Sequence, residues 1–206
     1  MNDAMRLAAA QLSRMRGMTR YYHERFFSDV RFSAVAFLAL FVLGFWDVPE
    51  AFLLIPPVAI LGAAQTAFDA SYLIFARHYA ASLEQYLNGA TGRRLLVAAR
   101  LEDRYLFPLN TGKVVTAAFG SGFSWFGFMT LLYTGAGVAA AGFGLALGWD
   151  ALQAAGTGWV AAYLVTISVA LVATLGVGLW WFVSGVGERR LEQILENDFA
   201  QQTASE

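Results

Sequence analysis

The chain alternates long apolar runs with short charged segments, and its basic residues are confined to alternate segments. All 14 Lys and Arg residues lie within residues 1–32, 76–113 and 187–206, whereas the turns at 46–50 and 149–150 carry only acidic charge. Basic residues beside membrane-spanning helices are retained on the cytoplasmic side. The distribution therefore predicts four transmembrane helices arranged as two hairpins, with both termini and the middle segment in the cytoplasm.

The composition agrees with an all-α integral membrane protein of the plasma (inner) membrane. Hydrophobic residues make up 58% of the chain and charged residues 14%, whereas soluble domains are roughly half apolar and a quarter charged. Cytoplasmic retention accounts for the arginine clusters, so we expect the lipid bilayer as a partner and no nucleic acid. The absence of cysteine excludes disulfides and thiolate metal sites.

We expect five segments along the chain. They are an amphipathic cytoplasmic or interfacial N-terminal helix (1–30), a first transmembrane hairpin (31–75), a cytoplasmic helical segment (76–113), a second transmembrane hairpin (114–186), and a cytoplasmic C-terminal helix and tail (187–206). The amphipathic helix has two interpretations: it lies on the inner membrane interface, or it packs on the protein's own cytoplasmic part.

The first apolar span, residues 32–46, is short. At about 1.5 Å per residue it reaches only ~22 Å, less than the ~30 Å hydrocarbon core. We therefore expect the helix to begin earlier, with Arg31 extending to the interface, and a re-entrant hairpin remains the alternative.

The other spans are predicted at 51–75, 123–147 and 158–183, the third beginning after a break at 120–122. We expect the second span to continue as a helix to Asn88 and Gly89, and Thr91 to cap a further helix over residues 93–106. A charged helix is expected over 188–199. The Leu-Glu-Gln triplets at 83–85 and 191–193 suggest either a parallel repeat of the two hairpins or a chance match.

Small residues recur at four-residue spacing in three of the spans. The ridges comprise Ala59, Ala63, Ala67 and Ser71; Ala136, Ala140, Gly144 and Gly148; and Ala162, Thr166, Ala170, Thr174 and Gly178. Such ridges predict close helix contacts, with the third and fourth spans as the tightest pair. The contacts fit one chain or several copies, so a homo-oligomer or a larger membrane complex is expected.

Asp69 is the one acidic residue inside a predicted span, with Gln65 and Tyr72 on the same helix face. An ionisable group at membrane depth is a candidate site for a proton, a cation or a polar ligand head. The structural alternative is a hydrogen bond or an ion pair near the inner boundary, where Arg77 or water would neutralise the charge.

Two juxtamembrane stretches, residues 21–27 and 102–107, mix aromatic and charged side chains. They predict either an aromatic belt at the headgroup level or a surface for a cytoplasmic protein partner. The candidate contacts with a partner or with lipid are Tyr22, Arg25, Arg77, Arg104 and Tyr105.

No motif for nucleophilic catalysis, phosphate binding or metal ligation is present, so we expect no cofactor, no metal and no catalytic residue. The two histidines, His23 and His78, are expected to make ordinary polar contacts. Two functional hypotheses follow. The first is a non-catalytic subunit or scaffold that acts through its cytoplasmic face, and the second is a homo-oligomeric channel or permease-like protein using Gln65, Asp69 and Tyr72.

Overall fold

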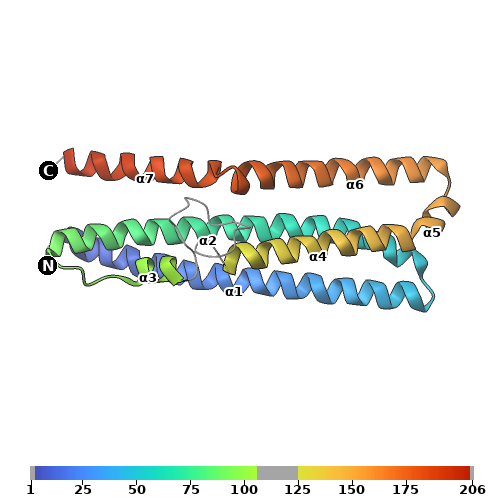
Figure 1. Cartoon of the computed structure of the whole chain (residues 1–206), viewed down its shortest axis with the longest axis horizontal. Helices are drawn as coiled ribbons and strands as arrows, with labels where there is room; N and C mark the ends of the chain where they lie inside the picture. The colour runs from blue at the N-terminus through green and yellow to red at the C-terminus, as the bar shows by residue number, and fades with distance from the viewer. Residues whose placement is uncertain (1–2, 106–124, 205–206) are drawn as a thin grey trace. The chain divides into compact units, whose positions relative to one another are not determined.

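The computed structural model describes residues 3–105 and 125–204, and every regular element in these ranges is a helix (Figure 1). In chain order they are α1 (Asp3–Trp46), η1 (Pro49–Leu54), α2 (Ile55–Thr91), α3 (Ala98–Tyr105), α4 (Trp125–Leu147), α5 (Trp149–Ala154), α6 (Thr157–Gly178), η3 (Leu179–Val183) and α7 (Val186–Ala204). The all-helical prediction is confirmed for the described residues. Four helical stretches are long and apolar enough to cross a membrane: Asp3–Trp46, Pro49–Thr91, Gly127–Leu147 and Thr157–Val183.

The described chain divides into two compact units. Unit 1 comprises the described parts of Met1–Arg25, Asp69–Phe128 and Trp180–Glu206, and unit 2 comprises Phe26–Phe68 and Met129–Leu179. Both α1 and α2 contribute residues to each unit. Most of the charged side chains belong to unit 1 and most of the predicted spans to unit 2.

The first span is part of a much longer helix. α1 contains 44 residues and begins at Asp3, so it is long enough to supply the ~20 residues that a crossing requires. The expected earlier start is therefore what the structure shows. The helix has no break near residue 30, where the sequence suggested a boundary between two segments.

The start and end of α2 follow from local chemistry. Pro56 and Pro57 lie in its first turn, where the missing N–H groups would have no intrahelical partner. The helix ends at Thr91, because Gly92 adopts a positive φ of 62°. Thr91 does not cap a following helix, so that prediction was wrong. Its hydroxyl instead donates to the carbonyl oxygen of Leu87, at 2.9 Å.

The next helix, α3, begins at Ala98 rather than at residue 93. The side chain of Asn88 holds the preceding segment out of helical geometry. Its Oδ1 accepts from the backbone N–H groups of Leu95 and Leu96, both at 2.9 Å, and its Nδ2 donates to the carbonyl oxygen of Leu96, at 2.6 Å. Asn88 therefore anchors a loop whose composition alone resembles that of a helix.

The later helices lie close to their predicted ranges. α4 begins at Trp125, and the expected break at 120–122 lies outside the described residues. The fourth span is α6 followed by η3, a short π-helix. The charged helix α7 extends beyond the predicted 188–199 at both ends.

Within unit 2, glycines on α1 and α4 allow close approach to the segment formed by η1 and Ile55, the first residue of α2. A Cβ at Gly44 would lie 2.5 Å from the ring of Phe52. A Cβ at Gly144 would lie 2.8 Å from both the Phe52 carbonyl oxygen and the Ile55 Cβ. Ile55 is completely buried. The Tyr163 hydroxyl of α6 donates to the carbonyl oxygen of Leu53 at 2.7 Å, so this segment contacts three helices.

The small-residue ridges predict these contacts only in part. Gly144 and Gly148 are buried, but they approach Phe52, Leu53 and Ile55 rather than the fourth span. Ala63 is exposed. No residue of α6 is buried, so the structure does not make the third and fourth spans the tightest pair. In a membrane protein the exposed ridge of α6 remains available to lipid or to another chain.

We expect Gly144→Ala to destabilise unit 2 by about 1–3 kcal/mol, because the new methyl group would collide with backbone and with a buried side chain. Gly142→Ala on the same helix is the matched control. Nothing lies within 4 Å of the place that its new methyl group would take, and alanine favours a helix over glycine by roughly 0.5–1 kcal/mol. Thermal unfolding in detergent micelles measures both. Equal midpoints for the two variants would contradict the close approach.

Candidate functional site

In unit 1 the buried residues of α2 follow a heptad pattern. Six of them, Asp69, Leu73, Ala76, Ala80, Leu83 and Leu87, lie at successive spacings of four and three, and the other three, Ala70, Ile74 and Glu84, each directly follow one of these positions. On α1, Ala8, Leu12 and Met15 repeat the pattern and form one hydrophobic cluster with Ala80, Leu83 and Leu87. Alternation of three and four keeps one stripe of a helix against its partner. The N-terminal helix thus packs on the protein's own chain, one of the two arrangements expected for it.

Asp69 occupies one of these core positions and has no exposed surface. Its Oδ1 lies 3.3 Å from Nε of Arg25, whose side chain is 43% exposed. A buried carboxylate is strongly destabilising unless it is paired, so Arg25 explains how an acid is tolerated between two helices. The structural interpretation of Asp69 as an ion pair is what the structure shows, with Arg25 on α1 as the partner.

Aromatic rings extend this cluster. Tyr22 of α1 stacks on Tyr72 of α2, with ring centroids 4.8 Å apart and planes 12° apart. Arg25 also donates from Nη1 to the hydroxyl of Tyr21, at 3.4 Å. The structure therefore brings together Tyr22 and Arg25, which were predicted as partner contacts, with Asp69 and Tyr72, which were predicted as a ligand site.

The other predicted residues lie elsewhere. Gln65 belongs to unit 2 and is half-buried. Arg77 is half-buried in unit 1. Arg104 and Tyr105 belong to α3, but their side chains lie outside the described part of the structure. The prediction that these residues contact a partner or lipid stays a prediction.

A second buried acid, Glu84, was not predicted from the sequence as a site residue. It is 4% exposed and forms an ion pair with Arg16 of α1 through Oε1. Its Oε2 accepts from the backbone N–H of Ala99, at 3.1 Å. Glu84 and Arg16 each follow a core position of the heptad, Leu83 and Met15, where paired charges commonly flank a helix seam. The heptad is thus the sequence signal that points to this pair.

The two Leu-Glu-Gln triplets also differ in their surroundings. Glu84 is buried in an ion pair, whereas the corresponding Glu192 on α7 is exposed. The shared letters therefore do not mark equivalent structural positions.

The two histidines have different environments. His23 is exposed. His78 is largely buried in unit 1, and its Nε2 has no hydrogen-bond partner within the described ranges. Burial lowers the pKa of His78 below its ordinary value of 6.5, an effect that Glu192 partly offsets and Arg77 reinforces. No group of three or more His, Asp or Glu side chains that could hold a metal occurs among the residues described.

These contacts define a helix seam in which each buried acid meets an arginine. No family model, curated protein or solved structure matches the chain. An enclosed, paired carboxylate is suited to holding two helices in register, and it offers no exposed oxygen to a ligand in this conformation.

We expect Arg25→Leu to lower the free energy of unfolding by about 3 kcal/mol, the lower end for broken buried pairs because Arg25 is partly exposed. Arg25→Leu combined with Asp69→Leu should recover most of the loss, since no unpaired charge remains buried. Thermal unfolding in micelles measures both variants.

The matched control is Arg20→Leu, which removes an exposed arginine from the same helix together with its ion pair to Glu24. Its unfolding midpoint should stay at the value of the unchanged protein. A double variant as unstable as Arg25→Leu alone would show that the arginine acts through something other than Asp69.

The buried His78, which lies outside the predicted spans, should make stability depend on pH. The unfolded chain binds a proton near pH 6.5 but the folded chain resists it, so the stabilisation is complete above pH 6.5 and declines as the pH falls below it. We expect the temperature midpoint of unfolding to decrease when the pH is lowered from about 7.5 to about 5.5. His78→Gln should reduce that fall, and His23→Gln, at an exposed position, should leave it unchanged.

Proposed function

We propose that this chain is a non-catalytic, multi-pass protein of the plasma (inner) membrane, with both termini in the cytoplasm. In this proposal it acts as a subunit or scaffold of a membrane complex through its cytoplasmic face. The four apolar helices supply the membrane anchor. The exposed face of α1 in unit 1 presents the contact surface.

The exposed face of α1 is the observation that carries the proposal. Leu7, Arg14 and Tyr21 recur every seven residues, next to but turned away from the core positions of the seam. Leu7 is 66% and Tyr21 56% exposed, and Arg14 is exposed as well. Arginine and tyrosine are residue types that anchor protein interfaces, and an exposed leucine beside them adds apolar contact area.

The exposure of the apolar helices supports membrane insertion. The candidate span Thr157–Val183 has no buried residue in its most apolar window. Val172 is 71% and Trp159 70% exposed. Apolar surface this extensive is unfavourable in water but matches the hydrocarbon core of a bilayer. Gly44 of α1 approaches Phe52 of η1, and Ser33 of α1 approaches Gly62 of α2. These approaches favour the first hairpin.

The polar groups of the spans favour a scaffold over a conduction path. Thr66, Thr134 and Thr166 each donate to a carbonyl oxygen four residues earlier, at 2.8–2.9 Å. Such bonds satisfy hydroxyls within their own helix. Asp69, the central residue of the channel hypothesis, is enclosed with Arg25.

The homo-oligomeric channel or permease-like protein remains a second candidate on one observation. Ala162 and Thr166 of the α6 ridge are exposed, so a second copy has a close-packing surface to meet. In that case the polar path would pass Gln65, Asp69 and Tyr72, and ion flux into vesicles would depend on Asp69.

To test the scaffold, the tagged chain is purified in mild detergent from its native membranes. We expect one partner protein at a constant ratio to the chain, and we expect Leu7→Ser combined with Arg14→Glu to reduce its recovery at least tenfold. Arg189→Glu is the control, because it makes the same charge change at an exposed position of α7.

A chain recovered without any partner would contradict the scaffold, as would equal losses in the α1 variant and the α7 control. Reconstituted vesicles address the alternative. Flux that Asp69→Asn abolishes, in a variant that keeps its thermal midpoint, would establish the channel instead.

A further inference from the structure

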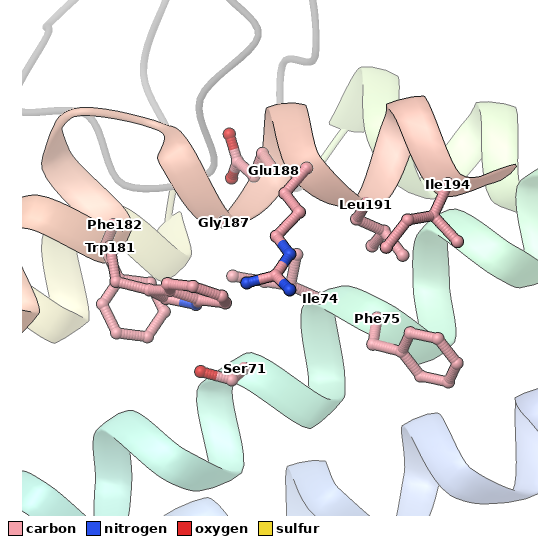
Figure 2. A pocket seen from close by; sticks show the side chains of 10 residues that line it. Ser71, Ile74, Phe75, Trp181, Phe182, Gly187, Glu188, Leu191 and Ile194 are labelled. Atoms are coloured by element: carbon pink, nitrogen blue, oxygen red, sulfur yellow. The ribbon is translucent and has the colours of Figure 1, made fainter. Parts of the chain in front are cut away.

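A cavity of about 240 Å³ lies in unit 1 between α2 and the segment formed by η3 and α7 (Figure 2). Its walls are mainly apolar. Ile74 and Phe75 come from α2, Trp181 and Phe182 from η3, and Leu191 and Ile194 from α7. In Figure 2 the Trp181 and Phe182 side chains lie at one end of the cavity, and Phe75 and Ile194 at the other.

The end of the fourth span shapes this cavity. The candidate span closes at Val183, so Trp181 and Phe182 are its last aromatic residues. They belong to a π-helix, a geometry that is rare and often accompanies functional sites. The chain then turns at Gly185, with a φ of 70°, before α7 begins. The turn sets the aromatic pair opposite the first turns of α7.

Gly187 makes room for the tryptophan. A Cβ at this position would lie 2.6 Å from two atoms of the Trp181 indole ring. Real Cβ atoms do not approach so closely, so any other residue would displace the ring that forms the cavity wall. The cavity therefore depends on a specific residue and is more than a gap between two helices.

Two charged residues line the same cavity and have different roles. Glu188 is buried, 6% exposed, and lies in the first turn of α7, where a carboxylate complements the positive end of the helix dipole. Arg190 is exposed, and no ion pair joins it to the described residues. Among the described residues, no acidic side chain pairs with this guanidinium, which lines the cavity.

The size and chemistry of the cavity match an amphiphile. An engineered apolar cavity of about 150 Å³ accepts benzene, so the volume here holds several methylene groups of an acyl chain. A mainly apolar lining that includes an exposed arginine suits a molecule with a hydrocarbon chain and an anionic head. The cavity adjoins the cytoplasmic end of the fourth span in the proposed topology, the depth at which anionic headgroups meet basic side chains.

We propose that this cavity binds one acyl chain of an anionic phospholipid of the bilayer, and that Arg190 holds the lipid phosphate. The inference rests on the membrane placement in the proposed function and is independent of any protein partner. The indole of Trp181 contacts the acyl chain, and Gly187 keeps that ring in place.

The test measures lipids that remain bound to the purified chain, by native mass spectrometry in detergent after titration with phosphatidylglycerol or phosphatidylcholine. We expect tighter binding of phosphatidylglycerol. Arg190→Gln should weaken it at least about tenfold, since a charge-assisted contact is lost. Arg189→Gln is the control, because it removes the same charge from the neighbouring residue, which does not line the cavity. It should change binding less than about twofold.

A second variant tests the apolar wall. Leu191→Trp fills the cavity and should reduce binding of both lipids. In a separate measurement, a phospholipid brominated on its acyl chain should quench the tryptophan fluorescence of the unchanged chain more than that of Trp181→Phe. Equal losses in Arg189→Gln and Arg190→Gln would overturn the site in favour of general surface attraction. Equal binding of the two lipids would overturn the preference for an anionic headgroup.

Vesicle flotation distinguishes a failure of the lipid site from a failure of the membrane placement on which it rests. A chain that fails to float with vesicles contradicts the membrane placement and the lipid site together. A chain that floats, yet binds phosphatidylglycerol equally well with and without Arg190, contradicts the lipid site alone.

Discussion

Unit 1 depends on the pairing of buried acids on α2 with arginines on α1. A carboxylate enclosed between helices costs several kcal/mol unless a cation meets it. Asp69 and Glu84 are both enclosed, and Arg25 and Arg16 meet them from the partner helix. Because the arginines are only half exposed, their apolar stems also cover the seam.

These ion pairs also restrict the register of α1 against α2. Leucine, alanine and methionine contacts along the seam tolerate a shift of register, since one apolar pair resembles the next. A charged pair at a given position does not tolerate it, because a shift of one turn would leave the carboxylate buried without a partner. Glu84 adds a bond to the backbone of Ala99, so the same acid also places the beginning of α3.

The sequence predicted the helical class and most helix ranges well, because runs of apolar residues and isolated basic segments carry that information locally. The contacts were harder to predict. Ala63 and Gly144 occupy similar ridges, yet Ala63 is exposed and Gly144 is buried. A small residue permits close approach but does not say which helix approaches. Thr91 and Asn88 show the same limit, since each side chain can bond to many backbone groups and only the folded chain selects among them.

The sequence singled out four residues of the seam one by one, but it did not predict that they meet. Asp69 and Tyr72 were found through their unusual place in a span, and Tyr22 and Arg25 through their aromatic and basic setting. Their meeting depends on which faces α1 and α2 turn toward each other, which the apolar heptad including Leu73, Ala80 and Leu83 determines, and on the register, which the ion pairs themselves determine.

In the proposed topology the arginines of the N-terminal segment serve two purposes. They keep the start of the first span in the cytoplasm. Two of them also neutralise acids of α2: Arg25 pairs with Asp69, near the end of the second span, and Arg16 pairs with Glu84, beyond it. Both partners lie on the same side of the membrane when the chain crosses it twice between them, as a transmembrane hairpin does. A segment that crossed only once would leave the arginines and the acids on opposite sides, so the two ion pairs are incompatible with a single crossing.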